Sequence, residues 1–192
     1  MKVVAFNGSP EKNGNTFQAI STVAQILAQH GIETEIIQLG GNRVSGCINC
    51  GYCAKNKNAK CGIDDDIINT CIEKMIAADG IIIGSPVYFG NVTTEVKALI
   101  DRAGRVTRGN GYLLKRKVGV PIVAARRAGT NFTYAAINFL FGISQMITPH
   151  SSYWNMTLSA APGDYQADEE GQGTFKTLGE NMAWLLEKTA TE

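Results

Sequence analysis

The sequence has no apolar run that approaches the roughly 18 consecutive residues a membrane-spanning helix needs. Its apolar start is too short for the core of a secretory signal, and no small-residue cleavage site follows it. Strong charge of either sign is also lacking: the 192 residues carry a formal net charge of +1, which gives no field to hold a polyanion. These absences predict a cytoplasmic globular protein with no membrane and no nucleic acid as partner.

Cysteine is used sparingly and unevenly. The chain has five cysteines, four of which are crowded together at positions 47, 50, 53 and 61. An odd number of cysteines without an export signal argues against a structural disulfide framework. Crowded cysteines in a reducing compartment more often bind metal or carry out redox chemistry. The two histidines, His30 and His150, are too isolated to be proposed as catalysts.

Low-complexity tracts and internal repeats are absent as well, and short β-branched runs alternate with longer helical stretches. This alternation predicts right-handed βαβ units, and therefore an α/β protein with a five-stranded, doubly wound parallel sheet covered by helices on both faces. A single domain is expected over residues 1–192, with a cysteine-bearing loop inserted at 40–62. The strands are expected at residues 2–6, 34–39, 80–84, 118–125 and 150–158, and the helices at 16–30, 67–78, 92–102, 131–143 and 175–188.

The loop after the first strand, residues 8–16, has the composition of an anion cradle. Its small and hydroxyl residues let backbone N–H groups close on an anion at the start of the following helix. It lacks the lysine of a nucleotide P-loop, because Asn15 stands at that position, and its two glycines are six residues apart rather than in a G-x-G-x-x-G pattern. A monophosphate held by neutral donors is the favoured ligand. An ordinary turn capped by Asn15 or Thr16 is the alternative.

The loop after the third strand, residues 85–92, favours a flat ring with polar edges. Pro86 stiffens the turn, Tyr88 and Phe89 offer aromatic surface, and Gly90 permits close approach of the backbone. The alternative is that the two aromatic residues simply belong to the core at the end of a strand.

Together with the segment 97–102 (KALIDR), these two loops resemble the NAD(P)H-dependent FMN reductase group of the flavodoxin-like superfamily over roughly residues 1–155. The resemblance implies a flavodoxin-like strand order of 2-1-3-4-5, FMN as cofactor and NAD(P)H as a candidate substrate. No catalytic side chain is expected, because the cofactor carries the chemistry. The resemblance places the FMN phosphate in the first loop and the isoalloxazine ring at the third, with the loop after strand four completing the site. The implied FMN-binding residues are Ser9, Pro10, Lys12, Gly14, Asn15, Thr16, Pro86, Val87, Tyr88, Phe89, Gly90, Asn91, Arg126 and Gly129.

The cysteine motif separates Cys47, Cys50 and Cys53 by two residues each, and Cys61 follows after seven more. Three closely spaced thiolates and a fourth further on can wrap one compact centre, as ligation of a [4Fe–4S] cluster requires. A four-cysteine zinc site, a redox disulfide between Cys50 and Cys53, and free thiols in a vestigial loop remain alternatives. Cys71, on an amphipathic stretch, is expected to be a small core residue.

Joined to the flavin loops, this spacing resembles the iron-sulfur flavoproteins. The resemblance implies a [4Fe–4S] cluster on the four cysteines, ferredoxin as electron donor, and a homodimer or homotetramer with the 40–62 loop at an interface. Quinones or oxygen species are the small-molecule acceptors considered. The alternatives are a cluster-free NAD(P)H-dependent FMN or quinone reductase, and a non-catalytic flavin- or metal-binding protein.

A group of cations is interpreted as a solvated face, or as a surface that docks an acidic electron carrier or contacts a cofactor. These cations are Arg102, Arg105, Arg108, Lys115, Arg116 and Lys117. Further along the chain, residues 160–173 are expected to form a mobile acidic loop.

Overall fold

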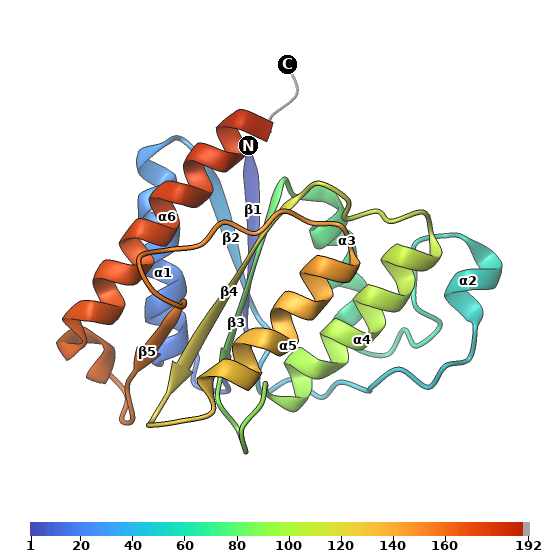
Figure 1. Cartoon of the computed structure of the whole chain (residues 1–192). Helices are drawn as coiled ribbons and strands as arrows, with labels where there is room; N and C mark the ends of the chain where they lie inside the picture. Colours follow the sequence, from blue (N-terminus) through green and yellow to red (C-terminus); the bar gives the residue numbers. More distant parts are fainter. Residues whose placement is uncertain (190–192) are drawn as a thin grey trace.

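A computed structural model describes residues 1–189 of the chain. Five parallel strands form one sheet in the order β2-β1-β3-β4-β5, which confirms the predicted topology (Figure 1). The strands are β1 (Lys2–Asn7), β2 (Glu33–Gln38), β3 (Gly80–Pro86), β4 (Val118–Ala125) and β5 (Met156–Leu158).

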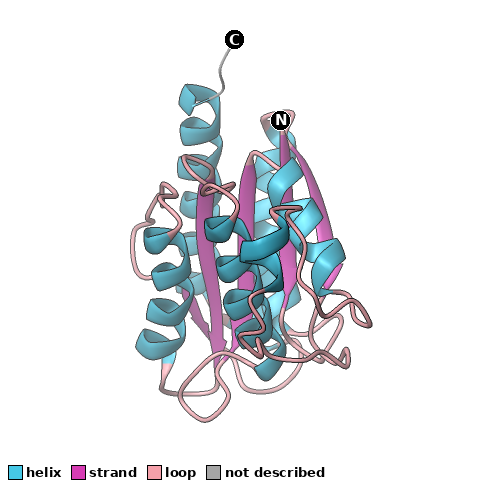
Figure 2. Cartoon of the chain, turned by 90° about the vertical axis from the view of Figure 1, so that its right-hand side faces the viewer, coloured by secondary structure: helices cyan, strands magenta, loops and turns pink. Residues whose placement is uncertain are grey.

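Helices cover both faces of this sheet, as Figures 1 and 2 show. One face carries α1 (Asn15–Gln29) and α6 (Glu169–Thr189), and the other carries α3 (Ile68–Ala77), α4 (Thr94–Gly109) and α5 (Thr130–Ile143). A short helix, α2 (Tyr52–Asn56), lies outside the layers, beyond α4 in Figure 1. A 3-10 helix spans Asp164–Ala167.

Strand β1 shows why the central strands read as unbroken apolar runs. Successive side chains of a strand point to opposite faces, and here both faces are covered. Val3 and Ala5 belong to the core under α1 and α6, whereas Val4 and Phe6 belong to the core under α3, α4 and α5.

Among residues 1–189, no helix combines the length and apolar character needed to cross a membrane.

Strand β5 and helix α4 differ in length from the prediction, and helix α6 begins at Glu169 rather than at residue 175. Strand β5 covers only residues 156–158, because the segment before it bonds to α6: Ser151 Oγ donates to the Thr174 carbonyl and Asn181 Nδ2 to the His150 carbonyl. Helix α4 runs to Gly109 rather than to residue 102, since Gly104 lies against Leu140 of α5 and does not interrupt it.

Two expected loops contain helical structure. Within 40–62, the left-handed residues Gly51 (φ 75°) and Lys57 (φ 52°) bound α2. Within 160–173, the 3-10 helix is followed directly by the first residues of α6. The segment between β2 and α3, residues 39–67, is called the cysteine loop below.

Candidate functional site

The loop that joins β1 to α1 ends at a helix start without a side-chain cap. Gly14 occupies the cap position, so neither Asn15 nor Thr16 caps the helix as the alternative interpretation required. The N–H groups of the first turn have no intrahelical acceptor and carry the positive end of the helix dipole. Ser9, Gly14, Asn15 and Thr16 line an open cavity of about 280 Å³ at this point. The arrangement suits an anion held by neutral donors.

Two amide side chains at the ends of β1 and β2 fix the shape of this loop. Asn7 Nδ2 donates to Gln38 Oε1 at 2.7 Å, and Asn7 Oδ1 accepts from the Ser9 N–H at 3.2 Å. Gln38 Nε2 donates to the Ser9 carbonyl at 2.7 Å. Ser9 Oγ accepts from the Glu11 N–H at 3.1 Å, which leaves its own proton available to a ligand. Asn7 and Gln38 were missed from the sequence, although a polar residue at the end of each of two adjacent strands was an available signal.

The side chain of Asn15 is occupied within the protein. Its Oδ1 accepts from the N–H groups of Gly163 (3.1 Å) and Tyr165 (3.2 Å), and its Nδ2 donates to the Ala161 carbonyl (2.8 Å). Asn15 therefore holds the 160–165 segment across the start of α1, and only its backbone N–H remains to face an anion. Pro162 of this segment lines the same cavity.

The loop after β3 forms a tight hairpin turn. The backbones of Tyr88 and Asn91 bond to one another at 2.9 and 3.1 Å, and the two residues between them are left-handed, Phe89 at φ 48° and Gly90 at φ 79°. Positive φ at both central positions is typical of a type I′ turn. Phe89 is fully exposed at the tip, and Tyr88 is half-exposed and lines the cavity. The aromatic pair is therefore not part of the core.

The loop after β4 meets this hairpin. Gly129, at φ 90°, precedes α5, and a Cβ there would lie 2.8 Å from Val87 Cγ1 and 3.1 Å from Gly90 Cα. Only glycine satisfies both the backbone conformation and the close approach. Arg126, exposed in the same loop, lines the cavity.

The cavity thus brings together predicted residues from all three loops. Pro10, Lys12, Phe89, Gly90, Asn91 and Gly129 are not part of its lining. The predicted residues that line it are Ser9, Gly14, Asn15, Thr16, Pro86, Val87, Tyr88 and Arg126, and the lining residues that were not predicted are Glu11, Ala124, Ser159, Ala160 and Pro162.

Thr93 joins the first and third loops to the start of α4. This buried residue donates its hydroxyl to the Gly8 carbonyl at 2.9 Å, and its N–H donates to Ser85 Oγ at 3.1 Å. Its oxygen also accepts from the Val96 N–H at 3.5 Å, which caps α4. The cap residue of one helix therefore fixes the backbone of the loop between β1 and α1.

The four crowded cysteines line one small apolar pocket against α4, with a volume of about 20 Å³. Cys53 is buried and Cys61 is half-buried, whereas Cys47 and Cys50 are exposed. Within residues 1–189, no three His, Cys, Asp or Glu side chains lie close enough to hold a metal ion together. The thiols therefore converge on one pocket without forming a site for a single ion.

Helix α2 is fastened to the carboxyl end of α4 through Asn110. Its Nδ2 donates to the Cys53 carbonyl at 3.3 Å, and its Oδ1 accepts from the Ala59 N–H at 3.0 Å. Lys57 Nζ donates to the Gly109 carbonyl at 2.5 Å. These contacts place Cys53 at the base of the pocket.

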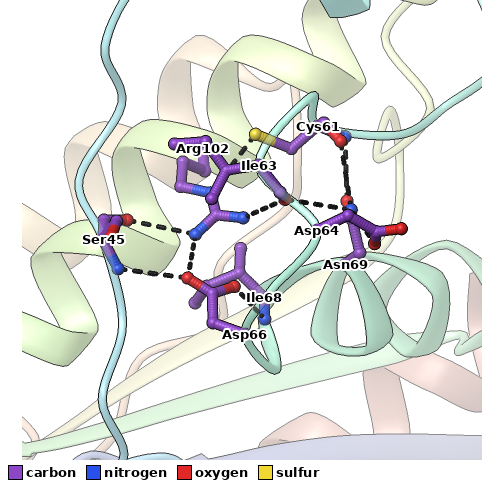
Figure 3. Close-up of polar contacts among 8 residues, drawn as sticks. All are labelled: Ser45, Cys61, Ile63, Asp64, Asp66, Ile68, Asn69 and Arg102. Atoms are coloured by element: carbon purple, nitrogen blue, oxygen red, sulfur yellow. Dashed lines mark hydrogen bonds and ion pairs between the residues drawn. The ribbon is translucent and has the colours of Figure 1, made fainter.

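Arg102 is completely buried. Figure 3 shows its polar contacts with residues of the cysteine loop. Its Nε donates to Cys61 Sγ at 3.3 Å, and its two terminal nitrogens donate to the carbonyls of Ser45 (3.1 Å) and Ile63 (2.7 Å) and to Asp66 Oδ2 (2.5 Å). The interpretation of Arg102 as part of a solvated face is therefore wrong. Its partners come from a distant segment, but its spacing from Leu99 and Val106 on the apolar face of α4 was an available signal of burial.

The charge of the buried pair is balanced by hydrogen bonds. Burial alone would raise the pKa of Asp66, but the hydrogen bond from Arg102 and those from the N–H groups of Ser45 and Ile68 outweigh it and hold that pKa below its usual value. Asp66 thus remains a carboxylate at neutral pH, and its second oxygen accepts from the first turn of α3.

Comparisons with known proteins agree with this geometry. The family described as NADPH-dependent FMN reductase matches residues 1–161. An iron-sulfur flavoprotein of Methanocaldococcus jannaschii is 38% identical, with 97% of each chain covered, and one of Archaeoglobus fulgidus is 39% identical, with 100% of this chain and 94% of the other covered. Among solved structures, a flavodoxin, WrbA-like protein from Agrobacterium tumefaciens has a TM-score of 0.65 at 16% identity over 98% of both chains, which supports the fold.

Proposed function

Since the chain belongs to the NADPH-dependent FMN reductase family and is a flavin-dependent oxidoreductase, we propose that it passes electrons between a reduced carrier and an acceptor through FMN and a [4Fe–4S] cluster. The observation that carries the proposal is the meeting of four cysteines of one loop at one pocket. When bound, FMN supplies transfer of one or two electrons and the cluster supplies transfer of one electron.

The support for the FMN site is the uncapped start of α1 and the cavity beside it. The phosphate is assigned to the Ser9 hydroxyl and the N–H groups of Asn15 and Thr16, because these donors are neutral and otherwise unused. Tyr88 and Pro86 offer apolar surface to the isoalloxazine ring. Arg126 supplies the positive charge that balances the anionic cofactor.

The support for a cluster rather than zinc is the spacing of the cysteines in the sequence. Cys47, Cys50 and Cys53 are separated by two residues each, and Cys61 follows after seven more, whereas a four-cysteine zinc site usually pairs two Cys-x2-Cys units across a longer gap. Three closely spaced thiolates and a fourth further on match the ligation of a [4Fe–4S] cluster, which takes each thiolate on a different iron. Two relatives, 38% and 39% identical, are named iron-sulfur flavoproteins.

A reduced, acidic carrier such as a ferredoxin is the proposed donor, and a quinone or an oxygen species the proposed acceptor. Arg105 and Arg108 are cations of α4, and Arg105 lines the cysteine pocket, so an acidic protein would be attracted to that side. Phe132, Phe139 and Ile143 are exposed on α5, which supports a homodimer or homotetramer. Free thiols support a cytoplasmic location.

The proposal is tested by anaerobic purification followed by quantitation of iron, sulfide, zinc and FMN with a visible spectrum. About four irons and four sulfides per FMN are expected. The variant Cys50→Ser should lose the visible absorbance of the cluster while FMN stays bound, because the two sites use different loops.

Cys71→Ala is the matched control. Cys71 is buried outside the cysteine loop, and burial, followed by the charge of Asp66, raises the pKa of its thiol to about 12, so it stays protonated. This variant should keep iron and FMN. FMN without iron in the wild-type protein would overturn the cluster, and NADPH oxidation with a quinone by that iron-free protein would establish the plain reductase.

A further inference from the structure

Arg102 is the one completely buried cation in residues 1–189, and it lies beside the cysteine pocket. An unpaired charge in such a place costs several kcal/mol, and even a paired one is seldom more stable than apolar residues of the same size. Stability alone therefore does not account for an arginine here.

The partners of Arg102 explain it better. Ser45 precedes the first cysteine of the loop by two residues, and Ile63 follows the last by two. Their carbonyls accept from different nitrogens of the same guanidinium, so one planar group ties the two arms of the loop to α4 (Figure 3). Asp66 accepts from the same guanidinium nitrogen as the Ser45 carbonyl and also accepts from the Ser45 N–H at 3.1 Å.

The remaining nitrogen, Nε, donates to Cys61 Sγ. Hydrogen bonds to the sulfurs of a cluster are among the features that set its reduction potential, because they stabilise the more negative, reduced state. A lysine can keep the charge, but its donors are on one nitrogen and it lacks the planar fork whose three separate nitrogens reach both arms and the sulfur.

We infer that Arg102 is a positioning residue of the cysteine pocket, which holds the two arms of the loop in place and raises the reduction potential of the cluster through its bond to Cys61. The part about the potential rests on the proposed function. The part about the loop does not, because it concerns the iron-free chain.

The loop is tested first, in iron-free protein, by hydrogen exchange of residues 43–50 and 60–66. The variants are Arg102→Lys and the double variant Arg102→Met with Asp66→Leu, which removes both charges and so avoids leaving a buried carboxylate unpaired. Lys97→Met is the control, since it removes an exposed cation from the same helix. Exchange at least tenfold faster than wild type is expected in both Arg102 variants and unchanged exchange in the control.

The potential is measured next, by redox titration of the visible spectrum of cluster-loaded protein. Arg102→Lys should lower the midpoint potential although the positive charge remains, and the double variant should lower it too, while Lys97→Met stays close to wild type. The measurement separates two roles of Arg102. Loss of a merely structural role would change the stability of the protein and leave the midpoint potential of the cluster unchanged, whereas loss of the bond to Cys61 Sγ would lower that potential.

The outcomes distinguish the two parts of the inference. Wild-type exchange in both Arg102 variants would overturn the positioning role. Wild-type potentials in both would overturn the tuning role. A wild-type chain that takes up no iron would overturn the proposed cluster, and with it the tuning role, whereas the exchange result would still decide what holds the loop.

Discussion

Replacing Thr93 by valine isolates one hydroxyl, which joins the start of α4 to the loop after β1. Valine keeps the shape of the side chain and removes both the bond to the Gly8 carbonyl and the cap on α4. Thr93 is 1% exposed, so water cannot replace the lost donor. The substitution therefore leaves a buried carbonyl unpaired in the loop assigned to the phosphate.

The size of the effect follows from the two bonds. The cap bond to Val96 is long, 3.5 Å, so the low end of the usual range for a cap applies, about 0.5 kcal/mol. The orphaned Gly8 carbonyl costs about 1–3 kcal/mol and dominates. The total of about 1.5–3.5 kcal/mol corresponds to a fall of roughly 3–14 °C in Tm for a chain of this size.

The measurements are thermal unfolding of flavin-free protein by circular dichroism and FMN titration by quenching of flavin fluorescence. Thr93→Ser is the matched control, because it keeps the hydroxyl and loses only a methyl group, roughly 0.8 kcal/mol of burial. We expect the valine variant to bind FMN at least tenfold more weakly than the serine variant, since its loop is less often in the binding conformation.

A valine variant with the same Tm and the same FMN affinity as the serine variant would refute this reasoning. The hydroxyl of Thr93 would then contribute to neither stability nor FMN binding beyond what the shape of the side chain contributes. A fall in Tm with unchanged affinity would separate the stability of α4 from the anion-binding loop and would contradict the assignment of the phosphate to this cradle.

Two further expectations concern other parts of the fold. Gly129→Ala should weaken FMN binding in the same titration, because the new Cβ would strain a left-handed backbone and clash with Val87 and Gly90. Gly142→Ala is the control and should leave FMN binding unchanged, because a Cβ at that position of α5 meets open space. Equal FMN affinities of the two variants would contradict the packing argument. The bond between His30 and Glu180, together with a second one to Glu187, raises the pKa of His30 above 6.5. The protonated imidazole therefore stabilises the fold below pH 6.5, and this stabilisation is lost as the pH rises through the pKa that His30 has in the folded protein. The Tm of wild type should therefore fall relative to that of His30→Gln between about pH 6 and about pH 8, and parallel curves would show that these bonds do not stabilise the fold.

The fold was predictable because its signals are local. The apolar runs of β1, β3 and β4 and the helices between them fix a parallel sheet, and a parallel sheet brings the loops after its strands to one edge. The first and third loops could therefore be placed at one cavity before any contact was known.

The parts that could not be predicted depend on contacts between distant segments. Arg102 is separated from Asp66 by 36 residues and from Cys61 by 41. Its spacing from Leu99 and Val106 puts it on the buried face of α4, but the sequence does not show which distant groups pair with its charge. Asn15 is a residue type that could bind an anion through its side chain. Its side-chain oxygen instead accepts hydrogen bonds from the N–H groups of Gly163 and Tyr165, almost 150 residues further along the chain. Helix α2 ends at a left-handed lysine, where the sequence offers no glycine as a signal.

The burial of Arg102 also has an evolutionary consequence. A descendant that lost the cysteine loop, and with it Ser45, Cys61 and Ile63, would lose both the partners of Arg102 and the segment that covers it. Selection would then no longer keep an arginine at this position of α4. The residue at position 102 should therefore change together with the cysteines across relatives, and an arginine there would mark genes whose products still use the loop.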